Sequence, residues 1–213
     1  MPVKRKRLRF LLVDDHPVVR AGIKQILTEN FEADFAEAGT AQEALAACRD
    51  LDLVVMDVSM PGRSGIDLIT DLTKCCPGTP CLVLSMHEEE QFARRALKAG
   101  ASGYVTKATA ATELVRAVKK VLEGGTYVSE KFGEYLATSI LKGDPGRIHE
   151  ALSDREFEVF RRIAAGRSGK EIAVELSLSF KTVSTYRTRV LQKLNLHTNY
   201  DLVNYARHEG LVE

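Results

Sequence analysis

The sequence lacks any apolar run long enough to cross a bilayer, and its first ten residues, MPVKRKRLRF, lack the apolar core of a signal peptide. We therefore expect a soluble, cytoplasmic protein without a membrane partner. The chain also has little net charge, because 30 Lys and Arg residues nearly balance 29 Asp and Glu residues. Total charge therefore indicates no class of partner, and only the local distribution of charge is informative.

Cysteine is scarce as well, with Cys48, Cys75, Cys76 and Cys81 the four in the chain. Their spacing has no paired pattern of the kind that binds zinc, and two adjacent cysteines are poorly placed to bridge each other. We therefore predict four free thiols in a reducing compartment.

The 213 residues suit two small domains, each with its own core. From Leu8 to about Gly124, short apolar runs alternate with helical periodicity, which is typical of βα units on a parallel sheet. The expected strands are RFLLV, ADFAEA, DLVVMD, CLVLS and SGYVT. Such a series predicts a doubly wound α/β fold, in which ligands lie outside the carboxyl ends of the strands.

The alternation ends after Gly124, and the turn-forming cluster KGDPGR at residues 142–147 predicts a domain boundary. We therefore expect an α/β domain over residues 1–124, a linker over 125–147 and an all-α domain over 148–213. In the last of these, Ser153 with Glu156 and Ser168 with Glu171 have the spacing of capping boxes, which begin helices.

Polar side chains follow four of the expected strands. Asp14 and Asp15 follow the first strand, Asp57 and Ser85 end the third and fourth, and Lys107 follows the fifth. Adjacent carboxylates repel each other and lose hydration near a buried strand, so the acidic pair requires a cation nearby. Asp15 by itself could instead simply open the next helix. Because four strands end in such polar residues, we favour the interpretation that these residues form one common site.

A carboxylate at such a site can attack phosphorus and form an acyl phosphate, provided that the charge on the phosphoryl oxygens is neutralised. We predict that Asp57 is this phosphoacceptor. Mg²⁺ would neutralise part of the charge, with Asp15 and Asp57 as ligands and Asp14 orienting a bound water. Lys107 adds a second positive charge, and the Ser85 hydroxyl can donate a hydrogen bond to a phosphoryl oxygen.

These motifs resemble the receiver domain of bacterial two-component response regulators. The segments LVDDHPVVRAG, VVMDVSMPGRSG and GYVTKA fall in that family's order and spacing within residues 8–124. The resemblance implies a flavodoxin-like (βα)5 fold, Mg²⁺ as the cofactor and a sensor histidine kinase as the phosphoryl donor. It also implies that Ser59 gives the metal its backbone carbonyl, and that Tyr104 acts with Ser85 and Lys107 as a switch around the phosphoryl group.

The C-terminal segment contains an expected helix over Phe180–Leu194 with two unlike faces. One face carries Val183, Tyr186, Val190 and Leu194 at three-, four- and seven-residue spacing, which predicts a core stripe. The other face combines small polar side chains with cations, and the helix has no acidic residue. Such a helix suits a major groove, where polar tips contact base edges and cations contact phosphates. The predicted DNA contacts are Lys181, Ser184, Thr185, Arg187, Thr188, Arg189, Gln192 and Lys193.

A solvated amphipathic helix would show the same charge pattern. The surrounding sequence, however, resembles the four-helix helix-turn-helix domain of the NarL/FixJ and LuxR type over about residues 152–212. This resemblance implies that promoter sites on double-stranded DNA are the partner. In relatives the last helix pairs two DNA-bound domains, so Leu202, Val203 and Ala206 would form a dimer surface. The alternative for these three residues is a simple core stripe.

The two resemblances together predict a phosphorylation-dependent transcription regulator that is a homodimer when phosphorylated, and not an enzyme. Hydrolases of the haloacid dehalogenase type also use an Asp nucleophile with Mg²⁺, but they carry a second acid where this chain has Ser59. A constitutive DNA-binding protein with an inactive receiver is the other alternative. It would have lost the acidic pair or Lys107, and all of these residues are present.

Overall fold

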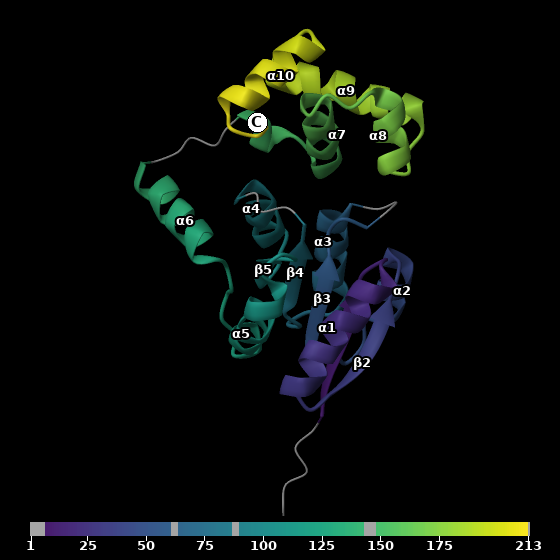
Figure 1. The fold of residues 1–213 in the computed structure, drawn as a ribbon, viewed down its shortest axis with the longest axis vertical. Coiled ribbons are helices and arrows are strands. Elements are labelled where there is room, and N and C mark those ends of the chain that lie inside the picture. The colour runs from purple at the N-terminus through teal and green to yellow at the C-terminus, as the bar shows by residue number, and fades with distance from the viewer. Residues whose placement is uncertain (1–6, 61–63, 87–89, 143–147, 213) are drawn as a thin grey trace, which may run out of the picture. The chain divides into compact units, whose positions relative to one another are not determined.

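The computed structural model describes residues 7–60, 64–86, 90–142 and 148–212, and it divides into two compact units, residues 1–139 and 140–213 (Figure 1). The first unit alternates strands and helices. Its elements are β1 (Leu8–Val13), α1 (Pro17–Asn30), β2 (Ala33–Ala38), α2 (Ala41–Ala46), β3 (Leu53–Asp57), α3 (Gly65–Cys75), β4 (Cys81–Ser85), α4 (Glu90–Lys98), β5 (Gly103–Thr106) and α5 (Ala110–Leu122). The strands pair in parallel in the order β2-β1-β3-β4-β5, which confirms the predicted doubly wound fold.

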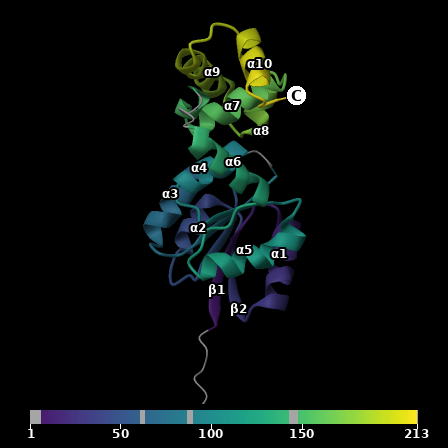
Figure 2. The same ribbon diagram turned by 90° about the vertical axis from the view of Figure 1, so that its left-hand side faces the viewer.

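Helices cover both faces of this sheet. On one face α1 contacts α5, and on the other α2 contacts α3, which contacts α4 (Figures 1 and 2). The main core lies under α1 and α5, where Phe10, Leu53 and Leu82 of the sheet pack against Leu27 and Leu114 of the helices. Every residue of β3 and of β4 is buried, as expected for inner strands of a parallel sheet. Both strands therefore lie entirely inside the unit.

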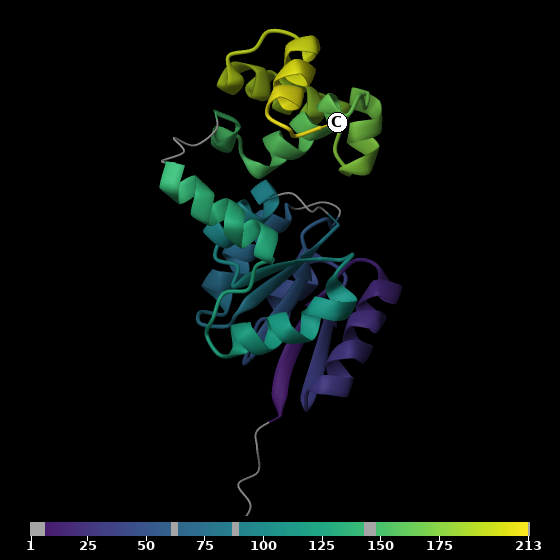
Figure 3. The same ribbon diagram turned by 60° about the vertical axis from the view of Figure 1, so that its left-hand side comes forward.

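The chain after α5 returns to pair with β5 before it forms α6 (Glu130–Lys142); the returning segment is teal in Figure 3. The Tyr104 N–H donates to the Tyr127 carbonyl at 2.9 Å, and the Tyr127 N–H donates to the Ser102 carbonyl at 3.0 Å. The Tyr127 hydroxyl accepts a hydrogen bond from Arg116 at 2.7 Å, and Phe132 of α6 is buried. Residues 125–139 of the expected linker therefore group with the α/β unit, whereas residues 143–147 lie outside the described residues.

The second unit is helical, with η1 (Ile148–Ala151), α7 (Asp154–Ala164), α8 (Gly169–Glu175), α9 (Phe180–Leu194) and α10 (Asn199–His208). Phe157, Phe160 and Leu202 are fully buried in its core. The two predicted capping boxes are confirmed. The side chains of Ser153 and Ser168 each accept a hydrogen bond from the backbone N–H of the Glu three residues later, and the side chain of that Glu accepts one from the backbone N–H of the Ser. A third box, Thr198 with Asp201, begins α10 and was not predicted. In the described part of the chain no helix has the length and apolar character of a membrane span.

The prediction of four free thiols is wrong for Cys48 and Cys76, which form a disulfide with 5.9 Å between their Cα atoms. Cys75 is a free, exposed thiol and Cys81 a free, buried one. The fold brings the bonded pair together because α2 contacts α3, and Cys48 and Cys76 each lie just after the C-terminal end of one of these helices. A separation of 28 residues carries no signal of this proximity in the sequence.

Candidate functional site

The parallel register brings the predicted site residues to one end of the sheet. Val13 is level with Met56, Asp57 with Leu84, and Ser85 with Thr106. The residues that follow β1 and β5, Asp14 and Lys107, therefore reach the same level as Asp57 and Ser85. The Lys107 N–H also donates to the Ser85 carbonyl at 2.7 Å, which fixes the loop after β5 against β4.

Lys107 holds two buried carboxylates together. Its Nζ lies 2.8 Å from Asp14 Oδ2 and 2.7 Å from Asp57 Oδ2, and the two carboxylates are only 1% and 2% exposed. Burial by itself would lower the pKa of Lys107, but the hydrogen bonds to Asp14 and Asp57 outweigh it and the pKa is raised. The amine therefore stays protonated at neutral pH, and one cation compensates two carboxylates that would otherwise repel each other.

Backbone N–H groups occupy the other oxygens of this pair. The His16 N–H donates to Asp14 Oδ1 at 2.8 Å, and the Ser59 N–H donates to Asp57 Oδ1 at 2.8 Å. These bonds orient both carboxylates, because each oxygen then has a fixed donor. They also place the backbone of Ser59 directly beside Asp57, where its carbonyl was predicted to serve a metal.

Asp15 differs from its neighbours, because its buried Oδ1 has no hydrogen-bond partner among the described residues. His16 Nδ1 lies 2.9 Å from this oxygen. One ligand atom each from Asp14, Asp15, His16 and Asp57 lie within 4.8 Å of one another. A hard divalent cation fits this oxygen-rich set, and it would satisfy the Asp15 oxygen that lacks a donor. His16 was not predicted as part of this set of ligand atoms. Its position directly after the acidic pair is the feature of the sequence that indicates it.

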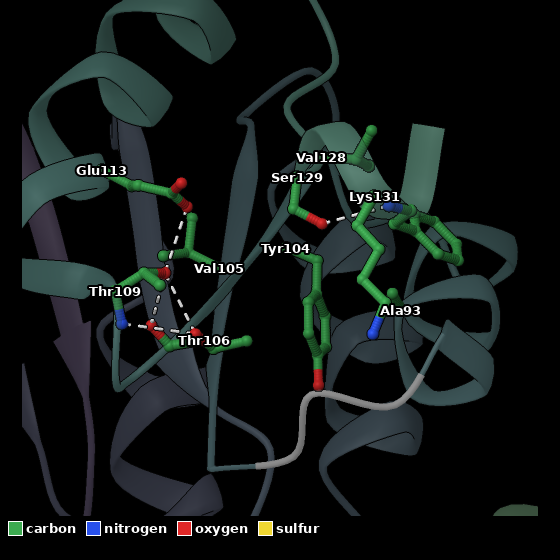
Figure 4. A pocket seen from close by; sticks show the side chains of 10 residues that line it. Ala93, Tyr104, Val105, Thr106, Thr109, Glu113, Val128, Ser129 and Lys131 are labelled. Carbon is green, nitrogen blue, oxygen red and sulfur yellow. Dashed lines mark hydrogen bonds between the residues drawn. The ribbon is translucent and has the colours of Figure 1, made fainter. Parts of the chain in front are cut away.

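Ser85 and Tyr104 are buried, at 0% and 6% exposure, and the backbone of Ser85 is bound to that of Lys107. Tyr104 borders a cavity of about 190 Å³ between α4, β5, α5 and the start of α6 (Figure 4). Lys131 lies alongside the phenol ring in this view, and Thr106, Thr109 and Glu113 form a hydrogen-bonded chain along one side of the cavity, from the end of β5 to α5. The lining residues are Ala93, Tyr104, Val105, Thr106, Thr109, Glu113, Val128, Ser129, Lys131 and Phe132. Tyr104 therefore borders the same cavity as Val128, Ser129 and Phe132 of the segment that follows α5.

In the second unit, α9 spans the predicted residues, and its apolar stripe is largely as expected. Val183, Val190 and Leu194 are buried together with Leu191, which was not predicted, while Tyr186 is only half-buried. The predicted DNA-contacting face is open to solvent at most positions. Lys181, Thr185, Thr188, Arg189 and Gln192 are exposed, and Ser184 and Arg187 are half-buried.

Two of the predicted DNA-contacting cations have partners inside the unit. Lys193 Nζ lies 2.6 Å from Glu156 Oε2 and donates to the Ala151 carbonyl at 3.2 Å. Glu156 is only 3% exposed and belongs to the capping box of α7, so Lys193 compensates a buried charge. Arg187 Nε donates to Asn199 Oδ1 at 2.5 Å. The Lys193 amine therefore serves a structural ion pair, and its role as a phosphate contact stays a prediction that this pair opposes.

The expected dimer surface on α10 also requires correction. Leu202 and Ala206 are fully buried in the core of the second unit, so neither side chain can reach another chain without unfolding. The core-stripe alternative holds for both residues. Val203 is half-buried and keeps some surface, and Tyr200, at 73% exposure, is the most exposed large hydrophobic side chain of this helix.

Comparison with protein families gives two matches. The model for the response regulator receiver domain matches residues 10–119, and the model for bacterial regulatory proteins of the luxR family matches residues 150–206. These two segments coincide with the α/β unit that carries Asp57 and with the helical unit that carries α9.

Full-length relatives share this arrangement. The oxygen regulatory protein NreC of Staphylococcus carnosus is 35% identical over 97% of this chain and 100% of its own length. The response regulator UvrY of Escherichia coli is 34% identical over 96% of this chain and 95% of its own length. A structure of RcsB from Salmonella enterica serovar Typhimurium is 26% identical, with a TM-score of 0.61, over 94% of this chain and 98% of that one. The chain therefore belongs to the two-component response regulators that join a receiver domain to a LuxR-type helix-turn-helix domain.

Proposed function

We propose that this chain regulates transcription by binding promoter DNA after Asp57 accepts a phosphoryl group from a sensor histidine kinase. The observation that carries the proposal is the buried pair of Asp14 and Asp57 held by Lys107, beside an Asp15 oxygen that has no donor among the described residues. Among the relatives, the RcsB structure was determined on promoter DNA with the phosphomimetic BeF3⁻. That complex supports the same pairing of receiver chemistry with DNA binding here.

In the proposed reaction an Asp57 carboxylate oxygen attacks the phosphorus of a phosphohistidine on the kinase. A P–O bond forms as the P–N bond breaks, and the imidazole nitrogen keeps the electron pair and takes up a proton. Lys107 then stabilises the transferred charge, and the buried Ser85 hydroxyl donates to a phosphoryl oxygen. Mg²⁺ held by Asp14, Asp15, Asp57 and the Ser59 carbonyl would supply further positive charge at the phosphoryl oxygens.

We assign three parts to the chain. Residues 1–124 are the receiver, 125–147 the linker and 148–213 the DNA-binding domain. The DNA-contacting face comprises Lys181, Ser184, Thr185, Arg187, Thr188, Arg189 and Gln192. Ser85 and Tyr104 rearrange when Asp57 is phosphorylated, the phosphorylated chain is a homodimer, and Val203 contributes to its surface. The protein acts in the cytoplasm and does not turn over external substrates.

Acetyl phosphate with Mg²⁺ tests the proposal directly. Wild-type protein should gain the mass of one phosphoryl group, and its affinity for genomic fragments selected with the phosphorylated protein should rise about tenfold, which corresponds to about 1.4 kcal/mol. Asp57→Ala should gain neither, and the isolated fragment from Arg147 should bind without any phosphoryl donor. Continuous phosphate release with turnover would favour a hydrolase. Asp57→Ala binding as tightly as phosphorylated wild type would favour a constitutive regulator.

A further inference from the structure

Three cysteines of the first unit lie together at the end of the sheet opposite to Asp57. Cys48 follows α2, and Cys75 and Cys76 are the last residue and the C-cap of α3. One sulfur from each lies within 4.8 Å of the other two. Because α2 leads into β3 and α3 into β4, the cluster lies at the amino ends of these strands, whereas Asp57 ends β3 at the carboxyl side.

The three sulfurs differ in what can reach them. Cys48 and Cys76 are 4% and 9% exposed and form the disulfide, with a Cα separation in the usual range. Cys75 is an exposed free thiol, and its Sγ lies 3.9 Å from the carbonyl oxygens of Leu45 and Cys48. An external reagent therefore meets Cys75 first, and Cys75 lies within a short distance of the buried bond.

We propose that Cys48, Cys75 and Cys76 form a thiol–disulfide exchange site for low-molecular-weight thiols and disulfides, in which Cys75 is the entry thiol. Exchange proceeds by attack of a thiolate on a disulfide sulfur. Adjacent cysteines are poorly placed to bond each other, so Cys48 is the sulfur with which either Cys75 or Cys76 can pair. In a reducing compartment a protein disulfide is usually transient and responsive to redox conditions. The inference is independent of phosphoryl transfer.

The oxidative direction has three balanced steps. The Cys75 thiolate attacks a low-molecular-weight disulfide RSSR, which forms Cys75–S–SR and releases RS⁻. The Cys48 thiolate attacks the Cys75 sulfur and expels the second RS⁻, and the Cys76 thiolate then attacks the Cys48 sulfur and expels Cys75. In total two electrons pass from Cys48 and Cys76 to RSSR, the two protons from these thiols go to the released RS⁻, and Cys75 is regenerated. Reduction by excess RSH follows the same steps in reverse.

The remaining cysteine provides an internal control. Cys81 lies in β4 with 2% exposure, and burial raises the pKa of its thiol to about 12. A thiol reacts as its thiolate, so Cys81 is inert at neutral pH even though it belongs to the same unit. The contrast between Cys75 and Cys81 follows from exposure alone.

The disulfide closes a loop that contains β3, the proposed phosphoacceptor Asp57 and α3, because these lie between Cys48 and Cys76 in the sequence. Closing this loop stabilises the fold chiefly by restricting the unfolded chain. Reduction should lower the thermal midpoint of the first unit by about 10 °C. Redox state would thus set the stability of the unit that carries the phosphoacceptor.

Full-length protein equilibrated in mixtures of reduced and oxidised glutathione tests the site, with acid quenching, alkylation and peptide mass spectrometry as the readout. We expect the Cys48–Cys76 disulfide to form reversibly and a glutathione adduct to accumulate on Cys75 in Cys48→Ser. Cys75→Ser should reach the same equilibrium at least tenfold more slowly, and Cys81→Ser should exchange at the wild-type rate. Phosphorylation of each variant by acetyl phosphate checks that the first unit is folded.

Three results would overturn the proposal. Exchange at the wild-type rate in Cys75→Ser would show that reagents reach the buried bond directly. Cys48 and Cys76 that stay reduced in fully oxidised glutathione would exclude the exchange reaction. Reduced protein that retains one equivalent of Zn²⁺ and protects the three thiols from alkylation would make the cluster a metal site.

Discussion

The two units present their candidate functional groups in opposite environments. In the first, Asp14 and Asp57 are almost completely buried and arrive from different strands, and Lys107 binds both. In the second, Thr185 and Arg189 come from one helix and are exposed to solvent. Chemistry at a single atom requires charges that are already fixed in place, whereas a surface that meets DNA can remain hydrated until DNA binds. A substitution should therefore alter stability in the first site and only binding in the second.

The largest departure from wild type is expected for Lys107→Met. Removing the shared cation leaves Asp14 and Asp57 buried beside each other, which should lower the free energy of unfolding of the first unit by about 3–5 kcal/mol. Urea denaturation with and without Mg²⁺ measures this, and Mg²⁺ should restore more stability in the variant than in wild type. Lys119→Met, on the exposed face of α5, is the matched control. Equal loss in the two variants would refute the role of Lys107.

Lys193→Ala tests an exception to this contrast, because Lys193 lies on α9, the proposed DNA-contacting helix, but its amine binds the buried Glu156. The variant leaves Glu156 without its cation and should cost about 1–3 kcal/mol of stability in the second unit, measured by urea denaturation. The dependence of DNA affinity on salt should remain as in wild type. A flatter salt dependence with unchanged stability would return Lys193 to the phosphate contacts.

Acidification should weaken the same ion pair. Burial alone would raise the pKa of Glu156, but hydrogen bonds from Lys193 and Ser153 outweigh it and the pKa lies below the ordinary value of 4.5. A depressed pKa in the folded state means that the contribution is complete above pH 4.5 and is lost as pH falls through the folded pKa. The stability difference between wild type and Glu156→Gln, followed by urea unfolding from pH 7 downward, should therefore shrink in that range. A difference that stays constant with pH would contradict the assignment.

The smallest change is expected for Arg189→Ala. Its side chain is exposed, so stability should change by less than about 0.5 kcal/mol. Loss of one phosphate contact should reduce the slope of log affinity against log salt by about one unit on any DNA sequence. Titrations at several salt concentrations on specific and random duplexes measure both quantities. A change confined to the specific duplex would place Arg189 on a base instead.

The parts of the molecule that depend on local pattern could be predicted from the sequence. β2 and β4 have the predicted bounds, as does α9, because each is a contiguous run of apolar or periodic residues. The carboxylate cluster followed from a general rule on strand ends in parallel sheets.

Features that depend on proximity in space were missed. The Cys48–Cys76 bond joins residues 28 apart, and the pair of Lys193 with Glu156 joins residues 37 apart. Neither pair has a spacing motif, because its geometry is set by how whole helices pack. Burial of Leu202 and Ala206 has the same origin, since an apolar stripe on a helix does not show whether its own domain or another chain covers it.

Tyr127 also protects the sheet against unwanted pairing. β5 is one of the two edge strands of the sheet, and an edge strand with bare backbone groups is a template on which another chain can add itself and aggregate. Tyr127 occupies the Tyr104 N–H and the Ser102 carbonyl, and Phe132 is buried just beyond it. Truncation at Gly124, where the repeating pattern ends, would strip this cover away. The shortest fragment of the first unit that keeps this cover must extend past Phe132 into the proposed linker.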